Sequence, residues 1–284
     1  MARYYFTDKQ QTMHHSPKVT PNNHPHSIKA VFFDIDGTLV SFKTHTIPDS
    51  TEKALKELRQ NGIKVITATG RSIGALESLR YLDFDGFVTF NGGYCITKES
   101  EVLLKEEINP SDIKQLLDYS LDQSLNFSLM YQNKVLVNEI TPDIVRMHQH
   151  VGLPLPPLVD RNNIDFSDIM QTNVFISPER EKAFMENIMP NCTSSRWTPL
   201  FADVNPKNIS KKVGLDAFCK HLSIDISETM SFGDGGNDIT MLRHAGIGVA
   251  MGNASPHVKE SADYITDDSD SDGILNALRY FGLL

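Results

Sequence analysis

The stretch AVFFDIDGTL, residues 30–39, decides the fold of this 284-residue chain. Ala30–Phe33 is apolar on consecutive residues, as a strand that is covered on both faces must be. Two aspartates, Asp34 and Asp36, follow at once. In an open parallel sheet, ligands bind at the carboxyl ends of the strands, so this placement favours a functional site. The alternative interpretation is an ordinary acidic turn, in which the aspartates hydrogen-bond their own backbone.

Short apolar runs alternate with amphipathic segments on both sides of this stretch. A helix is expected over residues 50–61, and further strands over residues 64–68, 86–90, 229–232, 247–250 and 262–265. Such alternation is typical of parallel βαβ units. The predicted fold class is therefore α/β, with a Rossmann-like doubly wound parallel sheet as its core.

The middle of the chain has a different character. A helix from Ser111, with Ile113, Leu116, Leu117 and Leu121 expected on its inner side, leads to short paired strands, further helical stretches and a strand over residues 173–176. We interpret residues 107–195 as an α+β domain inserted into a core made of residues 28–106 and 196–284. Residues 1–27 are polar and rich in proline and histidine, and we expect them to form a flexible tail.

Composition excludes several classes of partner. The formal net charge of −9 opposes binding to nucleic acid or to an anionic membrane surface, and no apolar run approaches the length of a membrane span. The three cysteines, Cys95, Cys192 and Cys219, fit neither a disulfide framework nor a metal site. We expect a cytoplasmic protein that binds a small molecule, with neither nucleic acid nor membrane as a partner.

Three further segments stand at the ends of expected strands or at the start of a helix. Thr69-Gly70-Arg71 offers a hydroxyl, a backbone N–H and a guanidinium after the second strand, all of them donors suited to phosphate oxygens. Lys211 begins an expected helix, and residues 233–238 form a glycine-rich turn. Each segment alone is more often a helix start, a surface charge or a plain turn. Because of their common position at strand ends, we expect these segments to meet at one edge of the sheet.

Four carboxylates belong to this predicted edge: Asp34, Asp36, Asp234 and Asp238. Such a cluster could not stay ionised without a cation, because like charges at short range repel. Hard oxygen ligands select Mg²⁺ over zinc. The sequence therefore predicts Mg²⁺ as a cofactor.

The four segments, in this order and spacing, resemble the motifs of the haloacid dehalogenase (HAD) superfamily of phosphatases. Details are similar to its Cof-type branch, subclass IIB with a C2-type cap, including Asn91-Gly92-Gly93 and residues 246–254. The resemblance covers residues 28–284 and implies that the inserted domain is a cap over the site. Lys212 stands where many relatives have glycine, and Lys211 is assigned to the motif because it follows the Ile-Ser pair.

The resemblance implies a role for each matched residue. Asp34 is expected to attack phosphorus, and Asp36 to protonate the leaving alkoxide and then take a proton from water. Mg²⁺ would be bound by the Asp34 carboxylate, the Asp36 main-chain carbonyl and the Asp234 carboxylate, with Asp238 in the outer shell. The groups expected to hold the phosphoryl oxygens are Thr69, the N–H groups of Gly70 and Ile35, Asn237 and Lys211.

The expected function is a Mg²⁺-dependent phosphatase for small phosphorylated metabolites, with sugar phosphates as the expected substrates by analogy. A phosphomutase on the same fold is the enzyme alternative, and a non-catalytic module that binds phosphorylated metabolites is the other. Arg71 either binds the substrate or braces its loop, and Asn91 is a second candidate for substrate contact. The cap is expected to hinge near residues 91–93 and 205–206.

Overall fold

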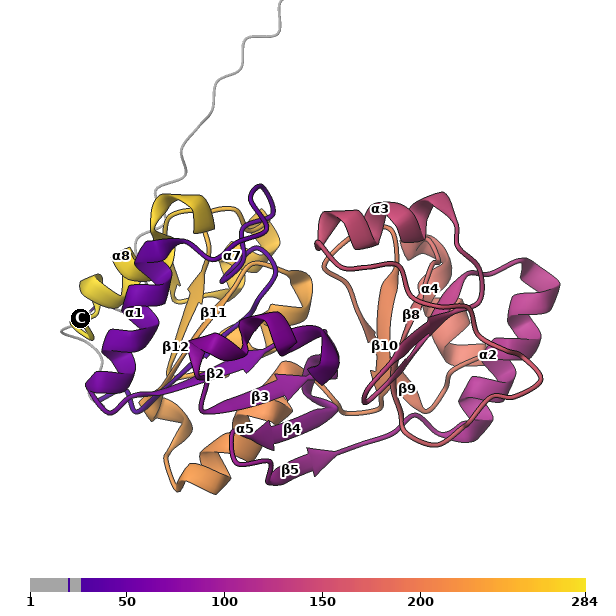
Figure 1. The fold of residues 1–284 in the computed structure, drawn as a ribbon, viewed down its shortest axis with the longest axis horizontal. Coiled ribbons are helices and arrows are strands. Elements are labelled where there is room, and N and C mark those ends of the chain that lie inside the picture. The colour runs from indigo at the N-terminus through magenta and orange to yellow at the C-terminus, as the bar shows by residue number, and fades with distance from the viewer. Residues whose placement is uncertain (1–19, 21–26) are drawn as a thin grey trace, which may run out of the picture.

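A computed structural model describes residue 20 and residues 27–284 of the chain. The tail expected over residues 1–27 lies outside the described residues, apart from Thr20 and Ser27. The described chain forms two units that lie side by side, and Figure 1 shows that the second unit, in magenta to orange, is inserted between two parts of the first.

The first unit, which we call the core, is built on one sheet with the strand order β13-β12-β11-β1-β2-β3-β4-β5. Pairing is parallel from β13 to β3, whereas β4 and β5 extend the edge as antiparallel strands. The strand bounds are β1 Ala30–Phe33, β2 Lys64–Ala68, β3 Gly86–Thr89, β4 Tyr94–Thr97, β5 Val102–Lys105, β11 Thr229–Gly233, β12 Ile247–Ala250 and β13 Tyr264–Ile265.

Helices cover both faces of this sheet. The α-helices are α1 Asp49–Gln60, α5 Lys211–Leu222, α6 Ile239–Leu242, α7 Pro256–Ser261 and α8 Gly273–Tyr280, and the 3₁₀ segments are η2 Ile73–Leu82, η3 Phe90–Gly92, η4 Ile226–Glu228, η5 Gly236–Asp238 and η6 Ser269–Ser271. Alternate residues of β1 face opposite layers: Val31 and Phe33 pack in the cluster of α1 and α8, and Phe32 packs with Phe218 of α5. The predicted doubly wound α/β fold is confirmed.

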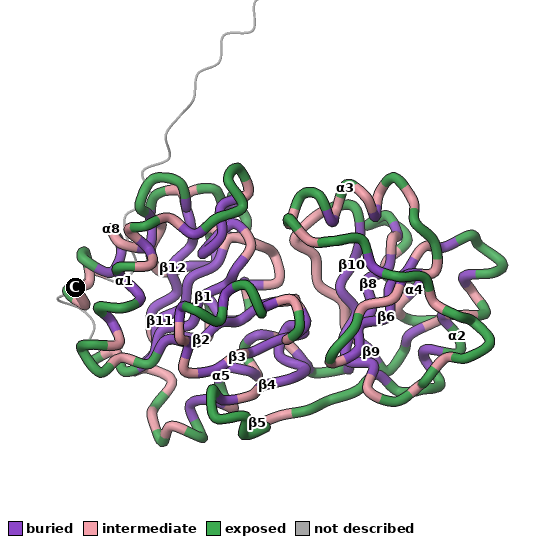
Figure 2. Tube along the Cα trace, in the orientation of Figure 1, coloured by how far each residue is buried: buried purple, intermediate pink, exposed green. Residues whose placement is uncertain are grey.

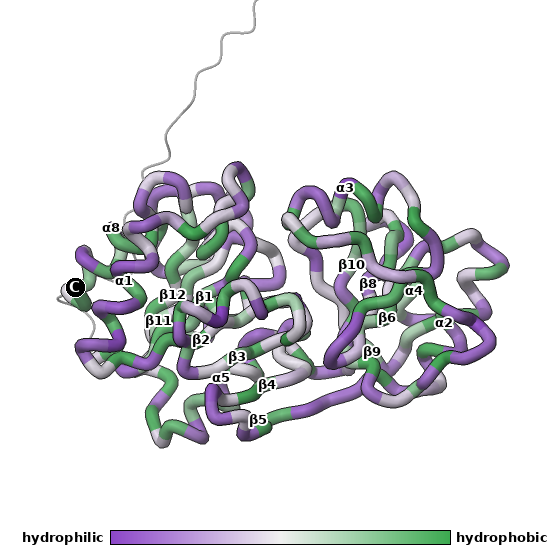
Figure 3. Tube along the Cα trace, in the orientation of Figure 1, coloured by the Kyte–Doolittle hydropathy of each residue, from purple (hydrophilic) through white to green (hydrophobic). Residues whose placement is uncertain are grey.

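The second unit, which we call the cap, is a single antiparallel sheet with helices on it. Its strand order is β7-β6-β8-β10-β9, and its main hydrophobic cluster is separate from those of the core. Figures 2 and 3 show buried, hydrophobic stretches along the strands at the centre of each unit. The bounds are α2 Pro110–Gln123, β6 Phe127–Tyr131, β7 Val135–Val137, α3 Pro142–His150, β8 Ile169–Val174, α4 Pro178–Asn187, β9 Cys192–Ser195 and β10 Ala202–Pro206.

Two details differ from the sequence-based expectations. Strand β10 pairs with both β8 and β9, so the cap sheet reaches Pro206, past the boundary expected at Ser195. The side chain of Leu121, expected on the inner side of its helix, is 66% exposed, because the buried face of α2 consists of Asp112, Ile113, Leu116 and Ser120.

Candidate active site

Three neighbouring strands of the core end at the same edge of the sheet. Asp34 follows β1, Thr69 follows β2 and Asp234 follows β11, and β1 pairs in parallel with both of the other strands. Parallel neighbours bring their carboxyl ends together, so segments far apart in the sequence meet here. This edge faces the cap.

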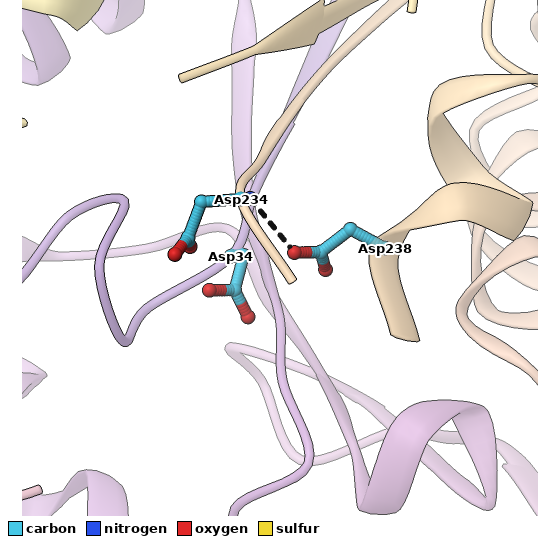
Figure 4. Close-up of side chains that lie close together, drawn as sticks. All are labelled: Asp34, Asp234 and Asp238. Carbon is cyan, nitrogen blue, oxygen red and sulfur yellow. Dashed lines mark hydrogen bonds between the residues drawn. The ribbon is translucent and has the colours of Figure 1, made fainter. Parts of the chain in front are cut away.

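Three carboxylates meet at this edge. Each of Asp34, Asp234 and Asp238 offers an oxygen, and these oxygens lie within 4.8 Å of one another (Figure 4). Burial, with the charge of Asp238 beside it, raises the pKa of Asp34 to about 7. Burial and the charge of Asp34 likewise raise the pKa of Asp234 well above its ordinary value. A hard divalent cation would relieve this repulsion, so the residues fit Mg²⁺.

Asp238 is committed to the protein on both of its oxygens. Its Oδ2 accepts the backbone N–H groups of Asp234 at 2.9 Å and Gly235 at 2.8 Å, and its Oδ1 accepts a hydrogen bond from Lys211 Nζ at 2.5 Å. Asp238 thereby fixes the turn that carries Asp234. It supports the other two carboxylates from behind.

Lys211 is completely buried at the start of α5. Its Nζ donates to Asp34 Oδ1 at 2.5 Å as well as to Asp238, and the exposed side chain of Lys212 points elsewhere. Burial works to lower the pKa of Lys211, but the two carboxylates outweigh it and hold the pKa above its ordinary value. The ammonium is therefore charged and neutralises part of the cluster.

Asp36 lies in a bidentate ion pair with Arg71. Arg71 Nε donates to Asp36 Oδ2 at 2.8 Å, and Nη2 donates to Oδ1 at 2.6 Å. The same Nη2 also reaches the carbonyl of Val151 in the cap, at 3.2 Å. Burial works against the charge of Arg71, but Asp36 outweighs it and raises the pKa of the guanidinium. Arg71 thus braces Asp36 and ties the core to the cap.

Two residues that orient Asp234 were missed by the sequence analysis. Thr38 Oγ1 donates to Asp234 Oδ1 at 3.0 Å, and Asn253 Nδ2 donates to Asp234 Oδ2 at 3.2 Å and to the Gly37 carbonyl at 2.9 Å. Gly37 has a φ of +84°, and a Cβ there would lie 2.4 Å from Asp234. The signal for Thr38 was its place in the first motif, and the signal for Asn253 was the run of residues 246–254.

The expected phosphate-binding groups lie around the same edge. Thr69 and Gly70 line the cavity, and Thr69 Oγ1 accepts the N–H of Arg71 at 3.1 Å. Asn237 also lines the cavity. Ile35 lies between the two aspartates, and its side chain packs in the core cluster.

Asn91 links the core to the cap. Its Nδ2 donates to Gln171 Oε1 at 3.1 Å and to Asp203 Oδ2 at 2.9 Å, and its Oδ1 accepts from Asn237 at 3.0 Å. Asn91 is 3% exposed, so its amide binds protein groups on three sides. The structure places it as a connection between the two units. It packs against Gly70, where an added Cβ would lie 3.2 Å from the Asn91 amide.

Polar residues of the cap that were not foreseen complete this connection. Asp203 Oδ1 accepts from Asn173 Nδ2 at 2.6 Å, and Asn205 Nδ2 donates to Gln171 Oε1 at 3.0 Å. Burial raises the pKa of Asp203 to about 6, although the hydrogen bonds from Asn91 and Asn173 oppose this rise. The available signal was polar residues two apart on β8 and again on β10, which places each pair on one face of its strand.

A cavity of about 390 Å³ lies between the core and the cap. Its core side holds the charged groups Asp34, Asp36, Arg71 and Asp234. Its cap side is mainly apolar and includes Met130, Val135, Met147, Leu153, Trp197 and Phe201. Lys211, Asp238 and Asn91 stand behind the surface of the cavity.

Three near-parallel rings meet across the two units at this cavity. Phe42 of the core stacks on His150, at the end of α3, with ring centroids 4.4 Å apart and planes 16° apart. Trp197 lies parallel to Phe42 at 6.3 Å and to His150 at 6.1 Å. With Arg71 and Asn91, this stack joins the cap to the core around the cavity.

The sequence itself matches a known family over this whole region. Residues 31–278 match the model of the haloacid dehalogenase-like hydrolase family. The chain belongs to this family. The predicted resemblance is confirmed, and the site described above lies within the matched residues.

Individual relatives agree with the family assignment. The putative phosphatase YkrA of Bacillus subtilis is 33% identical over 259 residues, which cover 90% of this chain and 98% of the relative. A HAD subclass IIB sugar phosphatase of known structure is 40% identical, with a TM-score of 0.83 over 90% of this chain and all of that one. A HAD phosphatase from Bacteroides thetaiotaomicron is 37% identical, with a TM-score of 0.84 over 92% of this chain and 97% of that one.

From the family match and these relatives we conclude that the chain is an enzyme, a HAD-type phosphatase. Phosphatases of the family act on small phosphorylated substrates. Within the described residues, the helices are too short or too polar to cross a membrane.

Proposed function

We propose that this phosphatase is Mg²⁺-dependent and hydrolyses small phosphorylated metabolites, sugar phosphates among them, through a phosphorylated Asp34. The observation that carries the proposal is the position of Asp34: it is buried at the end of β1, 2.5 Å from a charged lysine, and lines the cavity between the core and the cap. A carboxylate placed in this way can attack an electrophilic centre that enters from the cap side.

Two half-reactions follow from the groups present. In the first, an oxygen of Asp34 bonds to phosphorus while the bond to the leaving oxygen breaks, and Asp36 gives its proton to that oxygen. In the second, Asp36 takes a proton from water as the water attacks phosphorus, and the bond to Asp34 breaks, which gives inorganic phosphate. One carboxylate would be the nucleophile and the other the proton carrier. This division needs a cation beside Asp34 to keep it ionised, and the release of Asp36 from Arg71 so that Asp36 can carry a proton.

Arg71 fits a dual part in this scheme. It now holds both oxygens of Asp36, so one oxygen has to leave Arg71 before Asp36 carries a proton. An entering phosphoryl group is an anion that, like a carboxylate, can accept two N–H donors of one guanidinium, so it attracts the same side chain. We infer that substrate binding itself frees Asp36.

Asp34 and Asp234 would hold Mg²⁺ with their carboxylates, with the main-chain carbonyl of Asp36 as a third ligand and Asp238 behind them. When bound, the cation neutralises the negative charge that gathers where phosphate meets two carboxylates. Lys211, Thr69, Asn237 and the N–H groups of Ile35 and Gly70 would hold the phosphoryl oxygens. Lys211 is already charged and aimed at the nucleophile.

We also propose a cytoplasmic setting. Its support is chemical: Cys95, Cys192 and Cys219 are free thiols, each buried. Burial raises the pKa of Cys95 to about 12, which keeps that thiol protonated and unreactive.

A direct test is to incubate the purified protein and Mg²⁺ with a panel of sugar phosphates and to measure inorganic phosphate. The Asp34→Asn protein serves as the matched control, because the amide is nearly isosteric but is not an anionic nucleophile. We expect phosphate release by the wild type and less than about one per cent of that rate by the variant. Transfer of phosphate within the substrate without release would indicate a phosphomutase. Substantial activity in folded Asp34→Asn protein would refute the mechanism.

A further inference from the structure

The cap side of the cavity lacks a permanent positive charge. Among the lining residues, all of which are described, Arg71 is the one arginine or lysine, and it belongs to the core and is paired with Asp36. The cap supplies methionine, valine, leucine, tryptophan and phenylalanine side chains, together with neutral polar groups and Asp203. Such a wall favours apolar contact and cannot neutralise an anion.

Basic residues occur next to this wall in the sequence, but their side chains are engaged elsewhere. Lys134 precedes the lining residue Val135, and its Nζ lies 4.6 Å from the ring centroid of Tyr131. Arg146 precedes Met147 and pairs with Asp143. Arg196 precedes Trp197, pairs with Glu181 and donates to the carbonyls of Pro199 and Ile176. In all three places the apolar neighbour, rather than the basic residue, lines the cavity.

The histidines of the wall do not alter this picture. His148 is 6% exposed, and burial lowers its pKa, although the backbone of Pro154 opposes this. His150 is held by its ring stack on Phe42. The assays below are run at pH 8, where free imidazole is neutral.

The cap side of the cavity has a single carboxylate, which also disfavours a second anion there. Asp203 is 2% exposed, and its oxygens accept amide N–H groups of Asn91 and Asn173. Its negative charge, when present, repels a second anion in the cavity. A leaving group with its own phosphate or carboxylate would meet this charge and an apolar wall together.

We propose that the substrate carries one phosphate on an uncharged leaving group with an apolar face, and that the cap excludes leaving groups bearing a carboxylate or a second phosphate. This proposal rests on the proposed function, because it assumes that the phosphoryl group occupies the core side. Sugars and nucleosides fit this class, since their ring faces pack against apolar and aromatic side chains. Sugar acid phosphates and sugar bisphosphates do not fit it.

The test compares glucose 6-phosphate with 6-phosphogluconate, a pair with equal carbon number in which only the second has a carboxylate on the leaving group. At pH 8 with Mg²⁺, we expect kcat/KM to be about a hundredfold higher for the neutral leaving group, because the acid loses its hydration without gaining a partner. Equal turnover of the two, within about threefold, overturns the proposal.

A charge introduced into the wall should reverse part of the selection. Met147 is half-buried on α3 and lines the cavity. Met147→Lys adds a cation there, and Met147→Gln is the comparator of similar length without charge. The ratio of kcat/KM for the acid to kcat/KM for the neutral substrate should be about tenfold higher in M147K than in M147Q. Equal ratios in the two variants overturn the proposal.

A binding measurement separates this proposal from the proposed function. If wild-type protein releases no phosphate from any substrate, the proposed function fails. The affinities of Asp34→Asn protein for the two sugar phosphates, measured by calorimetry at pH 8 with Mg²⁺, then decide the proposal alone. We expect at least about tenfold tighter binding of glucose 6-phosphate, and equal affinities overturn the charge selection.

Discussion

The two walls of the cavity are built on opposite principles. The core wall gathers charge: Asp34, Asp36 and Asp234 face the cavity, and Lys211 and Arg71 pair with two of them. The cap wall gathers apolar side chains, and its polar groups are two histidines, Thr198, Asp203 and the amides of Gln171 and Asn173. One wall is suited to a group of fixed charge, and the other to a group of variable shape.

This difference matches the two halves of a phosphate ester. The phosphoryl group is the same in every substrate, so contacts with it raise the rate for all substrates and cannot discriminate between them. The leaving group differs, and contacts with it alter kcat/KM one substrate at a time. We therefore expect the core to set the rate and the cap to set the choice of substrate.

Removal of the metal should have the largest effect on phosphate release, because it acts on the charged groups of the core wall. Asp34 and Asp234 have raised pKa values because each is buried next to another carboxylate, and a phosphate anion would add to that repulsion. We expect EDTA to abolish phosphate release and Mg²⁺ to restore it. Phosphate release is the readout, and full activity in metal-free buffer would remove the cation from the mechanism.

Substitution of the buried lysine should have the next largest effect. Lys211→Met leaves two buried carboxylates without their partner, which costs about 3–5 kcal/mol of unfolding free energy, and it removes a ligand of the phosphoryl group. We expect the rate to fall about a hundredfold or more. Lys212→Met changes the exposed neighbour and should behave like the wild type in denaturant unfolding and in activity. Equal effects of the two variants would contradict the assignment of Lys211.

Loss of the ring stack between Phe42 and His150 should have a smaller effect on activity than loss of the buried lysine. Phe42→Ala removes the stack on His150, and such pairs contribute about 0.5–1.5 kcal/mol. Cap closure is common to all substrates, so kcat/KM should fall about three- to tenfold for each of them. Tyr280→Ala, which removes a stack on Tyr264 at a distance from the cavity, is the control for lost aromatic packing and should leave kcat/KM unchanged. A substrate-dependent effect of Phe42→Ala would instead place Phe42 among the residues that determine specificity.

Local signals were sufficient for the core wall. An apolar run followed by Asp34 and Asp36, and polar groups after β2 and β11, give both the strands and the edge at which they meet, because parallel neighbours share an orientation. Lys211 could also be assigned from its register in the motif. The bidentate pair of Asp36 with Arg71 could not be predicted, since it depends on the distance between two loops.

The cap could be predicted less well, for a physical reason. Strand β10 contains Asp203, Asn205 and Pro206, and it lacks the apolar run that marks a strand, because its polar face is satisfied by side chains of β8 and of the core. Partners brought in by tertiary structure allow polar residues to be buried. The prediction for Leu121 was wrong. Helical periodicity indicates which face of α2 is apolar, but it does not show how far along the helix that face is covered by a neighbouring element.

The most direct test of the division between the walls is a table of kcat/KM values for several sugar phosphates. Val135→Ala and Leu153→Ala alter the cap wall, and Thr69→Ala and Asn237→Ala alter the core wall. We predict that the core variants lower kcat/KM by one factor for every substrate, whereas the cap variants change the ratios between substrates. If each cap variant scales all substrates by the same factor, the cap does not determine specificity and the account is contradicted.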